Sequence, residues 1–297
     1  YAAASITFRE PVLSKDADFN PVFVVAEYET QGVAEKELTA GGRITALLFD
    51  EQVKVGATII SRREDGALEQ LGAVDAVVRL GETASLRVEA GSSTGGVAYL
   101  AEVQHATDTI EAVAYYRQQT AEYGLGQSPL GQGGVKKMGI DVRQKTGAEW
   151  SLVGSAYKES SMRDASERVY GDIRVEHRSE GRTVFGGARH VADRGATGAR
   201  ATTQALVAGV TQSLLDNTLD VTASTDLVVG GDQTTSYPTR HRIGARYQIF
   251  DGLRLIASHE MTPGDGPGGS ASQVGFEVEP WAGGRFGSTL NQSKVGE

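Results

Sequence analysis

The chain is built from one repeated feature: segments of roughly ten residues in which apolar and polar side chains alternate, joined by connections that are short and long in turn. Successive side chains of a strand point to opposite faces of a sheet, so this alternation predicts strands with one apolar and one polar face. Short and long connections that take turns are typical of a transmembrane β-barrel, where one rim carries tight turns and the other carries long loops.

Three tight corners show the pattern most clearly. They read LLFDEQVKV (47–55), SLLDNTLDV (213–221) and QIFDGLRLI (248–256): a bulky pair, an aspartate, turn residues and then renewed alternation. Asp followed by Asn or Gly favours a hairpin turn. We therefore predict that the strands on either side of each corner are antiparallel neighbours.

The number of alternating segments predicts the size of the sheet. We count about sixteen strands between residues 43 and 291, with a further strand at 21–30. Bacterial barrels usually close with an even number of strands. The predicted fold class is an all-β, antiparallel up-and-down transmembrane β-barrel of about 16–18 strands, with a lead-in segment at 1–20 and the barrel at 21–297. Because outer-membrane barrels generally end on an aromatic residue and this chain ends on Glu297, we expect it to be part of a longer chain.

Charged side chains of both signs occupy one phase of the strands. In the segment 240–250, for example, Ile243 and Tyr247 alternate with Arg242 and Arg246. We predict that the polar phase lines an aqueous lumen and that the apolar phase meets lipid. The predicted lumen-lining residues are Arg87, Glu89, Asp172, Arg174, Glu176, Asp220, Asp226, Arg240, Arg242, Arg246, Glu277 and Glu279.

Aromatic residues lie near the ends of the predicted strands, where barrels place girdles at the two membrane interfaces. The girdle predicted at the short corners consists of Phe49, Trp150, Phe185, Phe250, Trp281 and Phe286. The girdle predicted at the long loops consists of Tyr28, Tyr116, Tyr157, Tyr170 and Tyr237.

Composition narrows the possible partners and location. The net charge is −9, which argues against a nucleic-acid partner because a phosphate-binding face needs concentrated Lys and Arg. The chain has no cysteine, as suits passage through an oxidising periplasm. No segment reaches the about 18 apolar residues of a membrane helix. We expect outer-membrane lipid, and other surface or outer-membrane proteins, as partners.

The sequence carries no motif for catalysis or metal binding. Its five histidines are scattered without ligand spacing, and neither GxSxG nor a thiol nucleophile is present. The glycine-rich stretches at 124–134 and 263–269 are interpreted as extracellular loops, not as phosphate or calcium sites. We therefore predict no catalytic residue, no metal, no cofactor and no enzymatic activity.

Three segments resemble a known family. DADFNPVFVVAEYET (16–30), GRITALLFDEQVKVGATII (42–60) and PTRHRIGARYQIFDGLRLIASHE (238–260) are similar to the C-terminal β-barrel region of large, repeat-rich outer-membrane surface proteins of Gram-negative bacteria. The resemblance implies an outer-membrane barrel that anchors or exports a surface-exposed portion of a larger protein. The alternatives are a porin-like passive diffusion channel for small solutes and, third, a soluble all-β adhesin.

Overall fold

The structure of the chain is a computed structural model that describes residues 38–64, 67–124, 134–232, 237–263, 269–281 and 284–295. Within these ranges the regular structure consists of 16 strands, and none of it is a helix long and apolar enough to cross a membrane. The strands are β1 (Leu38–Leu48), β2 (Val53–Glu64), β3 (Ala67–Leu80), β4 (Ala84–Ser93), β5 (Val97–Ala106), β6 (Ile110–Gln119), β7 (Val135–Thr146), β8 (Trp150–Ser161), β9 (Glu167–Ser179), β10 (Arg182–Arg194), β11 (Arg200–Leu214), β12 (Leu219–Gly231), β13 (Arg240–Phe250), β14 (Leu253–Thr262), β15 (Gly269–Trp281) and β16 (Gly284–Val295).

Each strand pairs with its neighbours in the sequence, so the order runs from β1 to β16 without a crossover. Neighbouring strands run antiparallel, as in the hairpins of β9 with β10 and of β13 with β14. The predicted fold class, an all-β antiparallel up-and-down barrel architecture of about 16–18 strands, is confirmed with 16 strands, and β1 and β16 are the two ends of the order. The lead-in predicted at 1–20 and the strand predicted at 21–30 lie outside the described residues.

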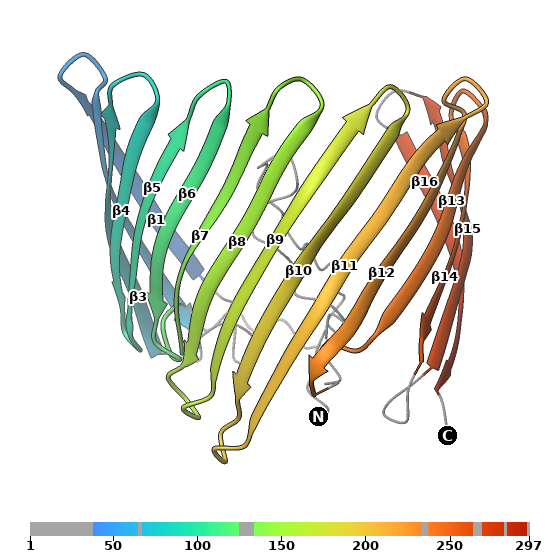
Figure 1. The fold of residues 1–297 in the computed structure, drawn as a ribbon. Coiled ribbons are helices and arrows are strands. Elements are labelled where there is room, and N and C mark those ends of the chain that lie inside the picture. Colours follow the sequence, from blue (N-terminus) through green and yellow to red (C-terminus); the bar gives the residue numbers. More distant parts are fainter. Residues whose placement is uncertain are drawn as a thin grey trace. The chain divides into compact units, whose positions relative to one another are not determined.

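The chain divides into two compact units. The first comprises Tyr1–Val103, Tyr116–Lys136 and Ser161–Arg163, and the second comprises Gln104–Tyr115, Lys137–Ser160 and Asp164–Glu297. In the second unit, β8 to β12 run side by side as long hairpins, coloured green to orange in Figure 1. The register of β9 with β10 continues without interruption from Arg182↔Ser179 to Arg194↔Glu167.

Two of the predicted tight corners share one backbone conformation. Three consecutive residues have positive φ in each: 53°, 51° and 65° at Phe49, Asp50 and Glu51, and 52°, 53° and 65° at 215–217. In both turns a backbone amide donates a hydrogen bond to the carbonyl oxygen of the first turn residue: Gln52 N to Phe49 O at 3.0 Å, and Thr218 N to Leu215 O at 3.1 Å. The prediction that these corners join antiparallel neighbours is confirmed.

Burial in this sheet is reversed with respect to a water-soluble sheet. Large apolar side chains are exposed along the strands, including Ile44 at 74%, Ile173 at 53% and Leu290 at 77%. Charged side chains are among the buried ones, including Asp172 and Glu176. We call the side of the sheet that carries these charges the polar face and the opposite side the apolar face. The alternation read from the sequence thus becomes two faces of opposite character.

Candidate functional site

The polar face of the second unit is the candidate site, because it gathers most of the predicted lumen-lining charges. Register places them together: Asp172 of β9 lies opposite Arg189 of β10, and Arg242 of β13 lies opposite Glu260 of β14. The intervening residues of the same strands, such as Ile173 and Ile243, point to the apolar face.

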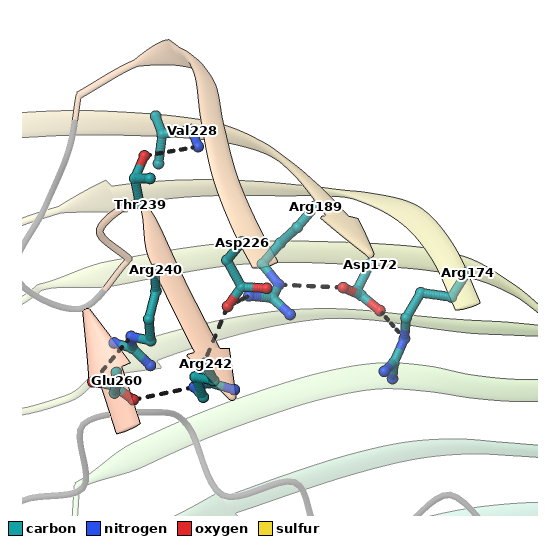
Figure 2. A network of polar contacts seen from close by, with 9 residues as sticks. All are labelled: Asp172, Arg174, Arg189, Asp226, Val228, Thr239, Arg240, Arg242 and Glu260. Carbon is teal, nitrogen blue, oxygen red and sulfur yellow. Dashed lines mark hydrogen bonds and ion pairs between the residues drawn. The ribbon is translucent and has the colours of Figure 1, made fainter. Parts of the chain in front are cut away.

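Seven charged side chains on the polar face form one alternating series, which we call the charge ladder: Arg174, Asp172, Arg189, Asp226, Arg242, Glu260 and Arg240 (Figure 2). Asp172 Oδ2 accepts from Arg189 Nε at 3.2 Å, and its Oδ1 lies 3.0 Å from Arg174 Nε. Asp226 Oδ2 lies 3.5 Å from Arg189 Nη1 and 3.6 Å from Arg242 Nη2.

The ladder ends at Glu260 of β14. Its Oε2 accepts from Arg242 Nε at 3.1 Å, and its Oε1 lies 3.6 Å from Arg240 Nε. Four arginines therefore share three carboxylates, so every acid has two basic partners. Next to the ladder, Thr239 Oγ1 accepts from the Val228 amide at 3.1 Å, which ties the start of β13 to β12 (Figure 2).

Strand β11 contributes no charged side chain to the ladder, and its side chains between Arg189 and Asp226 are short. Arg189 lies opposite Ala205, and Asp226 lies opposite Val207. Both β11 side chains are buried, with 6% and 3% exposure. Because these side chains are short, the guanidinium of Arg189 can pass over β11 and reach the carboxylate of β12.

An ion pair separate from the charge ladder is almost fully buried on this face. Arg143 Nη2 donates to Glu176 Oε2 at 3.1 Å, and the two side chains are only 7% and 9% exposed. The side chain of Asp172 is 3% exposed. Charges this deeply placed lose most of their hydration and depend on their partners.

The first unit carries its own charged pairs. Arg43 Nη2 donates to Asp75 Oδ2 at 3.0 Å, and Arg43 Nη1 lies 2.8 Å from Asp75 Oδ1. The predicted residues Arg87 and Glu89, two apart in β4, pair at 3.1 Å on one face. Their side chains are 51% and 37% exposed, so this pair remains in contact with water.

The remaining predicted residues lie on the polar face of the second unit by register. Asp220 lies opposite Arg246 and accepts from Ser213 Oγ at 2.6 Å. Glu277 lies opposite Arg254, and Glu279 follows two residues later in β15. These positions match the polar phase read from the sequence; that they line a lumen remains a prediction.

A tyrosine cluster lies on the polar face towards the long loops. Tyr157 of β8 and Tyr170 of β9 are stacked with centroids 4.8 Å apart, and Tyr237 packs 6.4 Å from Tyr170. All three rings are buried. The guanidinium of Arg168, which donates to Asp193 at 2.7 and 3.0 Å, lies 5.4 Å from the Tyr237 ring. Burial raises the pKa of the Tyr237 hydroxyl above its ordinary value.

This cluster differs from the prediction for the tyrosines. A girdle residue belongs on the apolar face, but Tyr157 and Tyr170 face each other on the side that carries Asp172. Cations explain the difference: Lys137 Nζ lies 3.8 Å above the Tyr157 ring, and Arg189 lies 6.0 Å from the Tyr170 ring. Aromatic rings thus cover cationic side chains here. Tyr28 lies outside the described residues.

The girdle predicted at the short corners is divided. Trp150 lies on the apolar face and packs against His177 with centroids 4.4 Å apart. Phe286 lies opposite Val278 of the apolar phase, and Phe49 and Phe250 are exposed at the corners. The backbone of Trp281 pairs with Gly284.

Phe185 corrects the girdle prediction. It lies opposite Glu176 and over Gly209, and the guanidinium of Arg174 is 5.7 Å from its ring. The ring is on the polar face because Arg189, four residues later in the same strand, has the same phase and joins the charge ladder.

Two ladder residues, Arg189 and Glu260, were missed by the sequence analysis. Both share the phase of neighbours on the polar face: Arg189 with Asp193, and Glu260 with Arg254. Counting the phase through each whole strand would have found them. Across the part of the chain that is described, no three His, Asp or Glu side chains are grouped so as to hold a metal ion.

Comparison with known proteins gives similarities of structure only. No family model matches the chain, and no curated protein sequence matches it. A triple mutant of the Rhodopseudomonas blastica porin is similar with a TM-score of 0.43 and 13% identity, over 87% of this chain and 94% of the porin. The translocator domain of the autotransporter NalP from Neisseria meningitidis has a TM-score of 0.24 and 16% identity, over 82% and 86% of the two chains. At these TM-scores neither similarity supports a conclusion about function, and the fold rests on the strand order and register above.

Proposed function

We propose that this chain is a transmembrane β-barrel of the outer membrane of a Gram-negative bacterium. The observation that carries the proposal is the reversed burial, with exposed aliphatic residues such as Val74 and Val274, each 59% exposed, on the face opposite the ion pairs. An apolar surface that extends along so many strands must be shielded from water. The hydrocarbon of a lipid bilayer shields it, and paired strands hydrogen-bond each other's backbone N–H and C=O groups within the bilayer.

A soluble all-β adhesin would place the same aliphatic residues against a second layer. Membrane fractionation separates the two possibilities. We expect the chain to remain with the membrane after washes with high salt and alkaline carbonate and to dissolve only in detergent. Release into buffer without detergent would overturn the proposal.

Within the membrane, we propose that the barrel anchors or exports a surface-exposed portion of a larger protein. The resemblance of residues 16–30, 42–60 and 238–260 to the barrel region of large surface proteins supports this role. The test is to delete residues 38–295 from the full reading frame. We expect the remainder of the protein to disappear from the cell surface, as judged by protease treatment of intact cells. If it persists there, the anchoring role is wrong.

A second role, a passive diffusion channel for small solutes, is favoured by the charges that remain in contact with water. Arg87 is 51% exposed and Arg242 is 35% exposed on their polar faces. Rings of such charges set the selectivity of aqueous pores. Stepwise current across a planar lipid bilayer would support the channel, and an inserted but silent barrel would leave the anchoring role alone. Neither role needs a catalytic residue, a metal or a cofactor.

A further inference from the structure

A groove with a volume of about 680 Å³ lies in the second unit, across strands β7 to β12. Small residues leave the space: Gly154 and Ala156 in β8, Gly171 in β9 and Ala188 in β10. The larger side chains of Ile173 and Leu206 border it on the apolar face. The volume falls in the range of about 300–1,000 Å³ that is usual for sites of small organic ligands.

One row of register partners breaks the apolar character of this face. Ala156 lies opposite Gly171, Gly171 opposite His190, and His190 opposite Gln204. His190 and Gln204 are exposed at the groove, and no hydrogen bond joins either side chain to another described residue. A polar group in hydrocarbon is costly unless it is hydrogen-bonded. The groove therefore favours an occupant with an apolar chain and hydrogen-bond acceptors.

Two arginines stand beyond this row, towards the long loops. Arg194 and Arg200 are register partners, and each lies four residues from His190 or Gln204 on the same face. At about 3.3 Å per residue, this places them roughly 13 Å along the strands from the polar row. Both are exposed, while the nearby Lys158 and Glu167 neutralise each other at 2.8 Å. Two cations thus lie on the same face, beyond the residues that line the groove.

We propose that this surface binds an anionic, phosphate-bearing membrane lipid. One acyl chain lies in the groove, His190 and Gln204 donate to the ester carbonyls, and the phosphate lies at Arg194 and Arg200, where guanidinium groups bind phosphate oxygens in pairs. The inference rests on the proposed function, since it requires the apolar face to meet lipid.

Charge favours a lipid over a second copy of the chain. Two copies in one membrane have the same orientation, so their long-loop rims lie at the same level. A second copy at this groove would bring further arginines to the rim, whereas a lipid phosphate brings the opposite charge.

The experiment uses the whole chain in phosphatidylcholine vesicles that contain a trace of spin-labelled phosphatidylglycerol or spin-labelled phosphatidylcholine. The measured quantity is the relative association constant of each labelled lipid with the protein. We expect phosphatidylglycerol to be preferred by about five-fold for each arginine it meets at low salt. The preference should fall to about unity in a variant that combines R194Q with R200Q.

Matched variants separate the two halves of the site. Gly171→Leu fills the groove without a clash, because a Cβ at Gly171 has no neighbour within 4 Å, and it should lower the immobilised component of both lipids by the one lipid that the groove holds. Gly72→Leu is equally open on the apolar face of the first unit and should change nothing. Arg63→Gln removes an exposed cation from that face, at the long-loop end of β2, and should leave the preference intact.

The outcomes are distinguishable. Equal association of the two lipids with the unaltered chain, or a preference that survives the R194Q and R200Q changes, would overturn the lipid site while the chain still inserts. A dimer in native mass spectra that Gly171→Leu dissociates would also overturn it, since the groove would then be a protein interface. Failure of the chain to insert into vesicles would overturn the proposed function itself.

Discussion

Arg189 of β10 and Asp226 of β12 meet at 3.5 Å although β11 lies between their strands. The contact exists because Ala205 and Val207, the β11 residues on the same face, are short. Three consecutive strands are therefore linked by side chains as well as by backbone pairing. Such a link strengthens the wall only if its charges remain paired, and this makes the ladder testable one residue at a time.

The first prediction concerns Asp172, whose nearly buried carboxylate is shared by Arg174 and Arg189. Asp172→Asn keeps the shape but removes the buried carboxylate that Arg174 and Arg189 share, while Arg189 keeps its contact with Asp226. We expect a loss of about 3–5 kcal/mol in the free energy of unfolding, measured by denaturant titration in detergent micelles. Glu89→Gln is the control: its pair with Arg87 is largely exposed and should contribute about 0–1 kcal/mol. Equal losses in the two variants would contradict the importance of burial.

The second prediction uses adjacent residues of β15 on opposite faces. Val274 is 59% exposed on the apolar face, and Gln273 lies on the polar face opposite Ser258 and Asn291. In a lipid bilayer, Val274→Arg should lower the free energy of unfolding by about 2–4 kcal/mol. Gln273→Arg should change it by less than about 1 kcal/mol, because its neighbours are uncharged and water reaches that face. If both changes cost the same, lipid does not cover the apolar face.

Strand phase explains both what the sequence predicted and where it failed. Alternation and turn residues sufficed for the strand order, the tight corners and the polar phase, because period and loop length are local properties. The girdle prediction for Phe185 failed because it used only the distance of Phe185 from a corner. Arg189 has the same phase in β10, so a Phe185 side chain facing lipid would have placed Arg189 against lipid as well. The charge on Arg189 was the signal against it. The crossing of β11 could not be predicted, since it depends on register between strands that the sequence leaves open.

The third prediction concerns the contact of Phe185 with Gly209. A Cβ at Gly209 would collide with the Phe185 ring. Gly209→Val should therefore destabilise the fold by about 1–3 kcal/mol through overpacking. Combining it with Phe185→Ala should recover part of the loss. Gly186→Val is the matched control, because a Cβ there has no neighbour within 4 Å and should be tolerated. A harmless Gly209→Val would show that the ring does not cover this glycine.

The last prediction compares the two corners that share one backbone. Their third residues, Glu51 and Asn217, both have φ of 65°. A left-handed backbone conformation costs most residues about 1–2 kcal/mol. The cost is smaller for Asn, and it is absent for glycine, which has no Cβ. Allowing for the greater freedom of glycine in the unfolded chain, Glu51→Gly should stabilise by about 0.5–1 kcal/mol and Asn217→Gly by less.

Gly252 has φ of 88°, and a Cβ there would lie 2.6 Å from the Glu279 carbonyl oxygen, so Gly252→Ala should destabilise. Thermal unfolding in one detergent ranks the three variants. A Glu51→Gly variant less stable than the unaltered chain would mean that the Glu51 side chain stabilises this corner by more than its backbone conformation costs.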